Sequence, residues 1–292
     1  MTEFNYRHIV RLTVPMIASL VLEQLIGFTD IIFLGRVSET AVAASALGGV
    51  AFLLFAMLGF GYAVAPQSQM ALENGRGHPR ITGHIFSQSL YALGLLCLII
   101  FGLSFFAPQA FDYLVEDAAI RDASMAYFLW RTAALPFAFL CIALRAFFIA
   151  TLQTRLLTVS SAVTVATNCV FNYVLIFGVG PIPALGIVGA AVASGIAEIA
   201  TVLLFLVYLK RSGDATRYGL WLFSAWDARL QSLLIVRGRW TMLQEAIVMT
   251  AWFLFFVWVE HLGQEALAVS NIVRTLADLP WILMHAFAAT CG

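Results

Sequence analysis

Long apolar segments separated by short polar connectors run through the whole chain. A helix needs about 20 predominantly apolar residues to cross the hydrocarbon core of a bilayer. The pattern therefore predicts an all-α integral membrane protein, a helical bundle with about eight transmembrane helices. These helices are expected at roughly residues 12–34, 42–68, 84–107, 123–150, 156–178, 186–209, 241–260 and 265–290.

One connector is longer than the others and rich in cations. It spans residues 210–239 and holds six Lys or Arg residues against two Asp residues. Six predicted helices precede it and two follow. We therefore predict an N-terminal six-helix lobe at residues 1–209, a basic cytoplasmic inter-lobe linker at 210–239, and the start of a C-terminal lobe at 240–292.

A weak internal repeat supports this division. A shift of 225 positions places residues 36–45 over residues 261–270, and three of these ten positions are identical. Parallel repeats related by an axis along the membrane normal are a transporter architecture. A second six-helix unit would need four more helices, so we expect a chain that lacks the last four helices of such a fold. A complete eight-helix protein is the alternative.

Composition supports the membrane interpretation and excludes several functions. Of the 292 residues, 62% are hydrophobic and 11% are charged, whereas soluble domains carry roughly 25% charged residues. The net charge is zero and gives no indication of a nucleic-acid partner. The four cysteines lie in apolar stretches without metal-ligand spacing, and no HExxH or GxSxG motif is present, so we expect no resident metal or cofactor and no enzyme.

The distribution of cations predicts the orientation. With the N-terminus in the cytoplasm, the inside connectors carry eleven Lys or Arg residues and the outside connectors carry two. Cytoplasmic loops are enriched in these residues. The sequence therefore predicts a multi-pass protein of the cell (inner or plasma) membrane with a cytoplasmic N-terminus.

Two carboxylates lie inside the first apolar segment. Glu23 and Asp30 are seven residues apart, which places them on one face of a helix. An ionisable group near the bilayer midplane costs at least ~2.5–3.5 kcal/mol, so it usually faces a cavity, a partner or a bound ion. A simple pairing of Asp30 with Arg36 at the helix end is the structural alternative.

Two other predicted helices carry polar pairs at a similar depth. Asn168 and Asn172 are four residues apart, as are Ser194 and Glu198, so each pair shares a helix face. Asparagine offers both donors and acceptors to a carboxylate or a cation. These residues therefore form a candidate site with Asp30 and Glu23. Asn and Ser also join membrane helices structurally, and Glu198 has Arg131 or Arg145 as an alternative structural partner.

Three stretches resemble the multidrug and toxic compound extrusion (MATE) family of transporters. PMIASLVLEQLIGFTDIIFLGR, with Pro15 and Asp30, resembles the first helix of that family. NCVFNYVLIFG resembles the fifth helix, and LGIVGAAVAS resembles the glycine-rich start of the sixth. The resemblance implies twelve helices in two six-helix lobes around a central cleft, of which this chain would hold the first eight.

The resemblance also implies a function and a site. It implies a monomeric secondary transporter that exports organic cations and amphiphilic drugs in exchange for H⁺ or Na⁺. Asp30, Asn168 and Asn172 would bind the proton or cation, with Na⁺ as an alternative ligand, and Glu23, Ser194 and Glu198 would line the substrate cavity. Glu23 departs from a usual Gln, and Glu198 stands where the family commonly has an apolar residue.

A mechanism and its alternatives follow from these charges. Ionised Asp30 would attract a cationic substrate, and protonation from outside would repack the first helix against the fifth and sixth and release it. A lipid-linked oligosaccharide flippase of the same superfamily, or an inactive fragment, are the alternatives. A flippase would need more cations in the cavity, whereas the in-membrane acids Asp30, Glu23 and Glu198 match the three in-membrane arginines in number.

Overall fold

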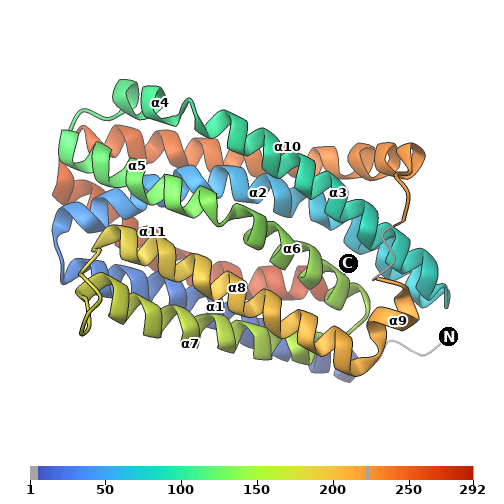
Figure 1. The fold of residues 1–292 in the computed structure, drawn as a ribbon. Helices are drawn as coiled ribbons and strands as arrows, with labels where there is room; N and C mark the ends of the chain where they lie inside the picture. The colour runs from blue at the N-terminus through green and yellow to red at the C-terminus, as the bar shows by residue number, and fades with distance from the viewer. Residues whose placement is uncertain (1–5, 221–223, 292) are drawn as a thin grey trace.

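The computed structural model describes residues 6–220 and 224–291, without the side chains of some residues near both ends, Glu23 among them. These residues form a long bundle of roughly parallel and antiparallel helices (Figure 1). The helices are α1 (Tyr6–Gly35), α2 (Glu39–Gly75), α3 (Pro79–Ser104), α4 (Ala107–Leu114), α5 (Ala118–Ala133), α6 (Leu135–Ala150), α7 (Thr154–Phe177), α8 (Ile187–Ser212), α9 (Asp214–Tyr218), α10 (Ala228–Glu260) and α11 (Gln264–Cys291).

Side-chain caps fix where several of these helices begin. Ser38 accepts a hydrogen bond from the Ala41 amide at the start of α2. Asp117 and Asp227 accept bonds from the first free amides of α5 and α10 in the same way. Such caps satisfy backbone donors that have no partner within the helix. The polar connectors of the sequence therefore act as helix starts.

The predicted helix at 123–150 is two helices in the structure. α5 ends at Ala133 and α6 begins at Leu135, and their axes are bent by 53° at the break. Pro136 lies in the first turn of α6, where its missing N–H costs nothing, but its ring is incompatible with a continuous helix through this point. Arg131 lies in the last turn of α5, just before this bend.

The predicted connectors also contain more helix than the sequence indicated. The acidic connector holds α4, and α10 begins at Ala228 rather than near residue 241, because Asp227 caps it there. Among the described residues five helices are long and apolar enough to span a membrane, and the bent pair α5–α6 makes a sixth. The integral membrane class is thus confirmed, whereas the count of eight spans is not.

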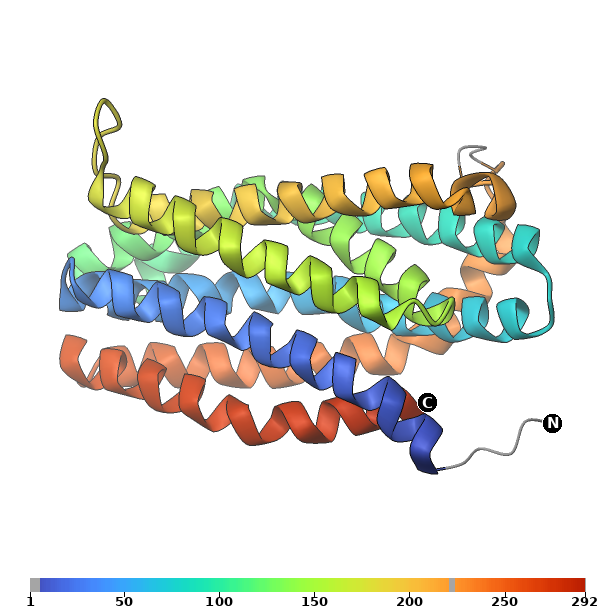
Figure 2. The ribbon, with the colours of Figure 1, turned by 90° about the horizontal axis from the view of Figure 1, so that it is seen from below.

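Helix boundaries follow the offset of the sequence repeat. α1 ends at residue 35 and α10 at residue 260, and α2 begins at residue 39 and α11 at residue 264, so both pairs differ by 225. α1 packs against α11, and α10 packs against α2 (Figure 2). If α1 is exchanged with α10 and α2 with α11, the α1–α11 contact becomes the α10–α2 contact. Two repeats related by a two-fold axis would show this pattern. The division into lobes at residues 209 and 240 stays a prediction.

Small residues allow the helices to approach closely. A Cβ on Gly61 of α2 would lie 2.8 Å from the Met242 Cα of α10. A Cβ on Gly189 of α8 would lie 2.6 Å from the Leu175 backbone of α7. Because lipid provides no hydrophobic drive for helix association, such close packing is how membrane helices hold together. These contacts position the helices that surround the cavity described next.

Candidate functional site

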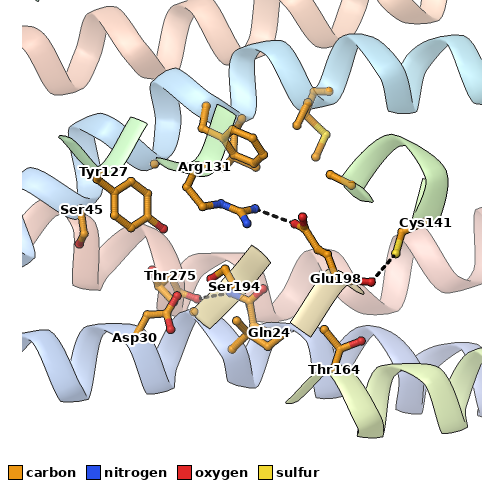
Figure 3. Close-up of a pocket in the computed structure, with 18 of the residues that line it drawn as sticks. Gln24, Asp30, Ser45, Tyr127, Arg131, Cys141, Thr164, Ser194, Glu198 and Thr275 are labelled. Atoms are coloured by element: carbon orange, nitrogen blue, oxygen red, sulfur yellow. Dashed lines mark hydrogen bonds and ion pairs between the residues drawn. The ribbon is translucent and has the colours of Figure 1, made fainter. Parts of the chain in front are cut away.

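A cavity of about 490 Å³ lies inside the bundle between α1, α2, α5, α6, α7, α8 and α11 (Figure 3). One part of its wall is apolar, with Phe52, Leu53 and Met57 of α2. Another part carries polar and charged side chains contributed by helices far apart in sequence. These are Gln24, Asp30, Ser45, Tyr127, Arg131, Arg145, Thr164, Ser194, Glu198, Thr201, Asn271, Arg274 and Thr275.

Asp30 is joined to α7 and α8 by a chain of hydrogen bonds. The Asn172 Nδ2 donates to Asp30 Oδ1 and also to Asn168 Oδ1, the latter at 2.8 Å. The Asn168 Nδ2 donates in turn to Ser194 Oγ at 3.2 Å. Both asparagines are almost fully buried, at 1% and 0% exposure. The structure thus brings together Asp30, Asn172, Asn168 and Ser194, which the sequence placed at one depth.

This chain of hydrogen bonds leaves one acceptor open. Asn172 Oδ1 is buried and has no hydrogen-bond partner among the described residues. A buried amide oxygen without a donor is costly, and oxygen is the ligand type that hard cations take. Asp30 and Asn172 together therefore fit a proton or a small cation such as Na⁺.

In the described part of the chain, no ion pair joins Asp30 to Arg36. Arg36 is exposed in the turn after α1, whereas Asp30 lines the cavity and contacts Asn172. The reason is the close packing of α1 against α7, which presents the amide of Asn172 to the carboxylate. The structure thus favours the site interpretation of Asp30 over the interfacial one.

Glu198 pairs with Arg131 across the cavity. Arg131 Nη2 donates to Glu198 Oε1 at 2.9 Å, and the two side chains are 12% and 17% exposed. The Arg131 guanidinium also lies 4.1 Å from the centre of the Phe52 ring, a favourable cation–π contact. Arg145, the other candidate partner, donates to Ser161 Oγ at 2.7 Å.

Several cavity residues were not among the predicted site residues. Tyr127 of α5 lies beside Arg131 on the cavity wall (Figure 3). Thr164 and Thr201 share a 2.6 Å hydrogen bond between α7 and α8, and Gln24 Nε2 donates to the Thr275 carbonyl at 3.0 Å, which joins α1 to α11. A cation inside an apolar segment signalled Arg131, but hydroxyl groups in membrane helices are too common to single out.

The described cavity wall carries fewer acidic side chains than the three that the sequence suggested. Its wall carries Arg131, Arg145 and Arg274 against Asp30 and Glu198. The Glu23 side chain lies outside the described part of the chain. Because Glu198 pairs with Arg131, Asp30 is the carboxylate of this described wall that is held by a neutral amide instead of by an arginine.

The fold and the polar cavity define a helical membrane protein with a charged internal cavity, and comparison with known proteins gives the family. The family model MatE matches residues 15–174, more than half of the chain. The chain therefore belongs to the MATE family, whose members are transporters and not enzymes.

Relatives with curated descriptions are multidrug resistance proteins. The chain is 28% identical over 303 residues to a probable multidrug resistance protein NorM of Synechocystis sp., covering 98% of this chain and 63% of that protein. It is 24% identical over 206 residues to the probable NorM of Pasteurella multocida, covering 70% of this chain and 44% of that protein. The chain thus spans about half to two thirds of the length of these relatives.

Solved structures share the fold. The MATE multidrug transporter DinF-BH superposes with a TM-score of 0.87 at 16% identity over 99% of this chain and 64% of that chain. A MOP superfamily transporter from Pyrococcus furiosus, whose reversed pocket polarity was taken to suggest a different function, gives 0.82 at 18% identity over 97% of this chain and 62% of that one. At such low identity these similarities show the fold alone.

Proposed function

We propose that this chain is part of a secondary multidrug efflux transporter that exchanges amphiphilic organic cations for H⁺ or Na⁺ by alternating access. The observation that carries this proposal is the hydrogen-bonded chain from Asp30 through Asn172 and Asn168 to Ser194 at the cavity wall. The relatives named as multidrug resistance proteins support the substrate class.

The arrangement suits a carboxylate that alternates between a bound proton and a bound cation. An amide partner stabilises a carboxylate less than an arginine does, because it carries no opposite charge. Ionised Asp30 therefore makes the cavity attractive to a cation. Protonation or Na⁺ binding removes that attraction and changes the packing of α1 against α7 and α8, which releases the substrate.

The membrane orientation completes the proposal. One end of the bundle holds the turns after α2 and α6 and the segment around α9, and the other holds the turns after α1, α7 and α10 (Figure 1). The first end carries Arg76, Arg80, Arg155 and Lys210 and is the proposed cytoplasmic side of an inner or plasma membrane. The protein acts as a monomer in this proposal, with residues 1–209 and 240–292 contributing to two lobes.

Ethidium efflux from cells that lack their own drug pumps tests this function. The chain is expected to lower ethidium accumulation, and Asp30→Asn to return it to the level of cells without the chain. Asp112→Asn changes an exposed carboxylate and should leave efflux intact. Collapse of the proton gradient or removal of Na⁺ identifies the coupling ion. Efflux by Asp30→Asn at the wild-type rate would exclude the proposed role of Asp30.

A further inference from the structure

The Arg131–Glu198 pair connects the bend of one helix to the wall of another. Arg131 lies in the last turn of α5, just before the 53° break, and Glu198 lies in α8 one turn beyond Ser194. Both side chains line the same cavity as Asp30 (Figure 3). A charge pair at this place can therefore respond to events at Asp30.

The pair leaves a donor and an acceptor unused. Arg131 Nη1 and Glu198 Oε2 are buried and have no hydrogen-bond partner in the described part of the chain. Arginine commonly binds a carboxylate through two parallel hydrogen bonds, whereas one bond of 2.9 Å joins these two groups. The guanidinium consequently retains donors for a second acceptor.

Asp30 is the second carboxylate within electrostatic reach of Arg131. The charges of Asp30 and Arg131 act on each other, and Tyr127 is close enough to interact with Asp30, Arg131 and Glu198. No direct bond joins Asp30 to Arg131 among the described contacts. The titratable and charged groups that line the described cavity around Arg131 are Asp30, Tyr127, Cys141, Arg145, Glu198 and Arg274.

We propose that Arg131 is a positioning residue that is shared between Asp30 and Glu198, and that Glu198 is the carboxylate that binds the cationic group of the substrate. When Asp30 is ionised, Arg131 turns toward it and leaves Glu198 open to a substrate cation. When Asp30 takes a proton from solvent, Arg131 returns to Glu198, as in this structure, and displaces that cation. This inference rests on the proposed exchange of protons for organic cations.

Charge balance gives the physical reason. An unpaired charge in a buried site is strongly unfavourable, and Arg131 supplies one positive charge for the two carboxylates Asp30 and Glu198. Either a proton on Asp30 or a substrate cation on Glu198 removes the remaining negative charge. The charges of these three side chains are therefore balanced with one of the two ligands bound and unbalanced with both or neither. Binding of the proton and binding of the substrate cation consequently oppose each other.

Binding of ethidium to the purified chain in lipid nanodiscs, followed by fluorescence anisotropy at pH 8, tests the inference. Asp30→Asn, which imitates protonated Asp30, should weaken binding by about tenfold, or about 1.4 kcal/mol. Adding Arg131→Gln to Asp30→Asn should restore binding, because nothing then competes for Glu198. Adding Arg145→Gln instead should not restore binding. Arg145 is the matched control because it is a second cavity arginine, bonded to Ser161. If the Asp30→Asn/Arg131→Gln chain binds as weakly as Asp30→Asn alone, the inference is wrong.

Two further variants keep the test decisive if Arg131→Gln prevents folding. Glu198→Gln should bind ethidium about tenfold more weakly than the wild-type chain at pH 8 and equally weakly at pH 6. Binding by this variant at the wild-type affinity at pH 8 would overturn the inference. Arg131→Lys in the Asp30→Asn background keeps the competing charge and should bind as weakly as Asp30→Asn. Wild-type binding by Asp30→Asn itself would instead contradict the proposed function.

Discussion

Asp30 and Glu198 are two carboxylates on the wall of one cavity, and the protein stabilises them in different ways. Asp30 accepts a hydrogen bond from Asn172, a neutral amide in a chain that ends at Ser194. Glu198 contacts the guanidinium of Arg131 at 2.9 Å. An amide tolerates both the charged and the neutral form of a carboxylate, whereas an arginine strongly favours the charged form. The difference indicates that Asp30 is the carboxylate that can gain or lose a proton, and that Glu198 responds to this change through Arg131.

Removing Glu198, the partner of Arg131, should have the largest effect on stability. Glu198→Ala leaves the buried charge of Arg131 without its partner, which is expected to lower the free energy of unfolding by about 3–5 kcal/mol. The thermal unfolding midpoint in detergent measures this. The double change Arg131→Met/Glu198→Leu removes both charges and should recover most of the loss. An unchanged midpoint for Glu198→Ala would show that the pair is not buried as described.

Removing the Asn172 amide that contacts Asp30 should lower the free energy of unfolding by less. Asn172→Ala removes the donor to Asp30 and Asn168 from a fully buried position, with an expected cost of about 1–3 kcal/mol. Asn172→Asp also removes this donor and places a second carboxylate against Asp30, and should weaken the contact between α1 and α7. The same unfolding measurement compares both variants with Glu198→Ala. A larger loss for Asn172→Ala than for Glu198→Ala would reverse the order that the comparison predicts.

The contact between α1 and α11 should matter less still. Gln24→Ala removes the 3.0 Å hydrogen bond to the Thr275 carbonyl, a change of about 0.5–1.5 kcal/mol. Because this bond closes one wall of the cavity, we expect faster labelling of a cysteine placed at Asn271 by a soluble maleimide in the Gln24→Ala chain. Gln24→Glu keeps the length of the side chain but cannot donate to this carbonyl, so it should be labelled as fast as Gln24→Ala. Equal labelling rates with and without Gln24 would show that the bond does not close the cavity.

The smallest effect concerns a carboxylate at the end of the bundle. Gln264 donates to Asp117 at 2.7 Å and, with the amides of Ile120 and Ala119, lowers the pKa of Asp117 below its ordinary value of 3.8. A lowered folded-state pKa gives stability that is present above the ordinary pKa and is lost as the pH falls through the lowered one. Gln264→Ala should therefore make unfolding slightly less sensitive to acid between pH 5 and pH 3. A steeper acid dependence in this variant would contradict the assignment.

The sequence predicted the membrane class and the neighbourhood of Asp30, because each depends on local patterns. Apolar length identifies membrane helices, and the spacing of Asn168 and Asn172 fixes a shared face. Orientation then placed these residues and Ser194 at the depth of Asp30, and the structure joins them by hydrogen bonds. Their roles in transport stay predictions.

Other features depend on packing that local patterns do not contain. The sequence offered Arg131 and Arg145 equally to Glu198. In the structure Glu198 pairs with Arg131 at the end of α5, whereas Arg145 of α6 donates to Ser161. The start of α10 at Ala228 depends on the cap by Asp227, although polar residues in that segment resemble a loop. Tyr127 carries no local signal and becomes part of the cavity wall through the position of α5.

The most direct test of the central claim is the pH dependence of ethidium affinity in the wild-type chain and in Asp30→Asn, measured on purified protein in nanodiscs at pH 6 and pH 8. If the charge of Asp30 controls cation binding, the wild-type chain binds ethidium more tightly at pH 8 than at pH 6. Asp30→Asn then binds weakly and equally at both values. Wild-type affinity and wild-type pH dependence in Asp30→Asn would contradict the account.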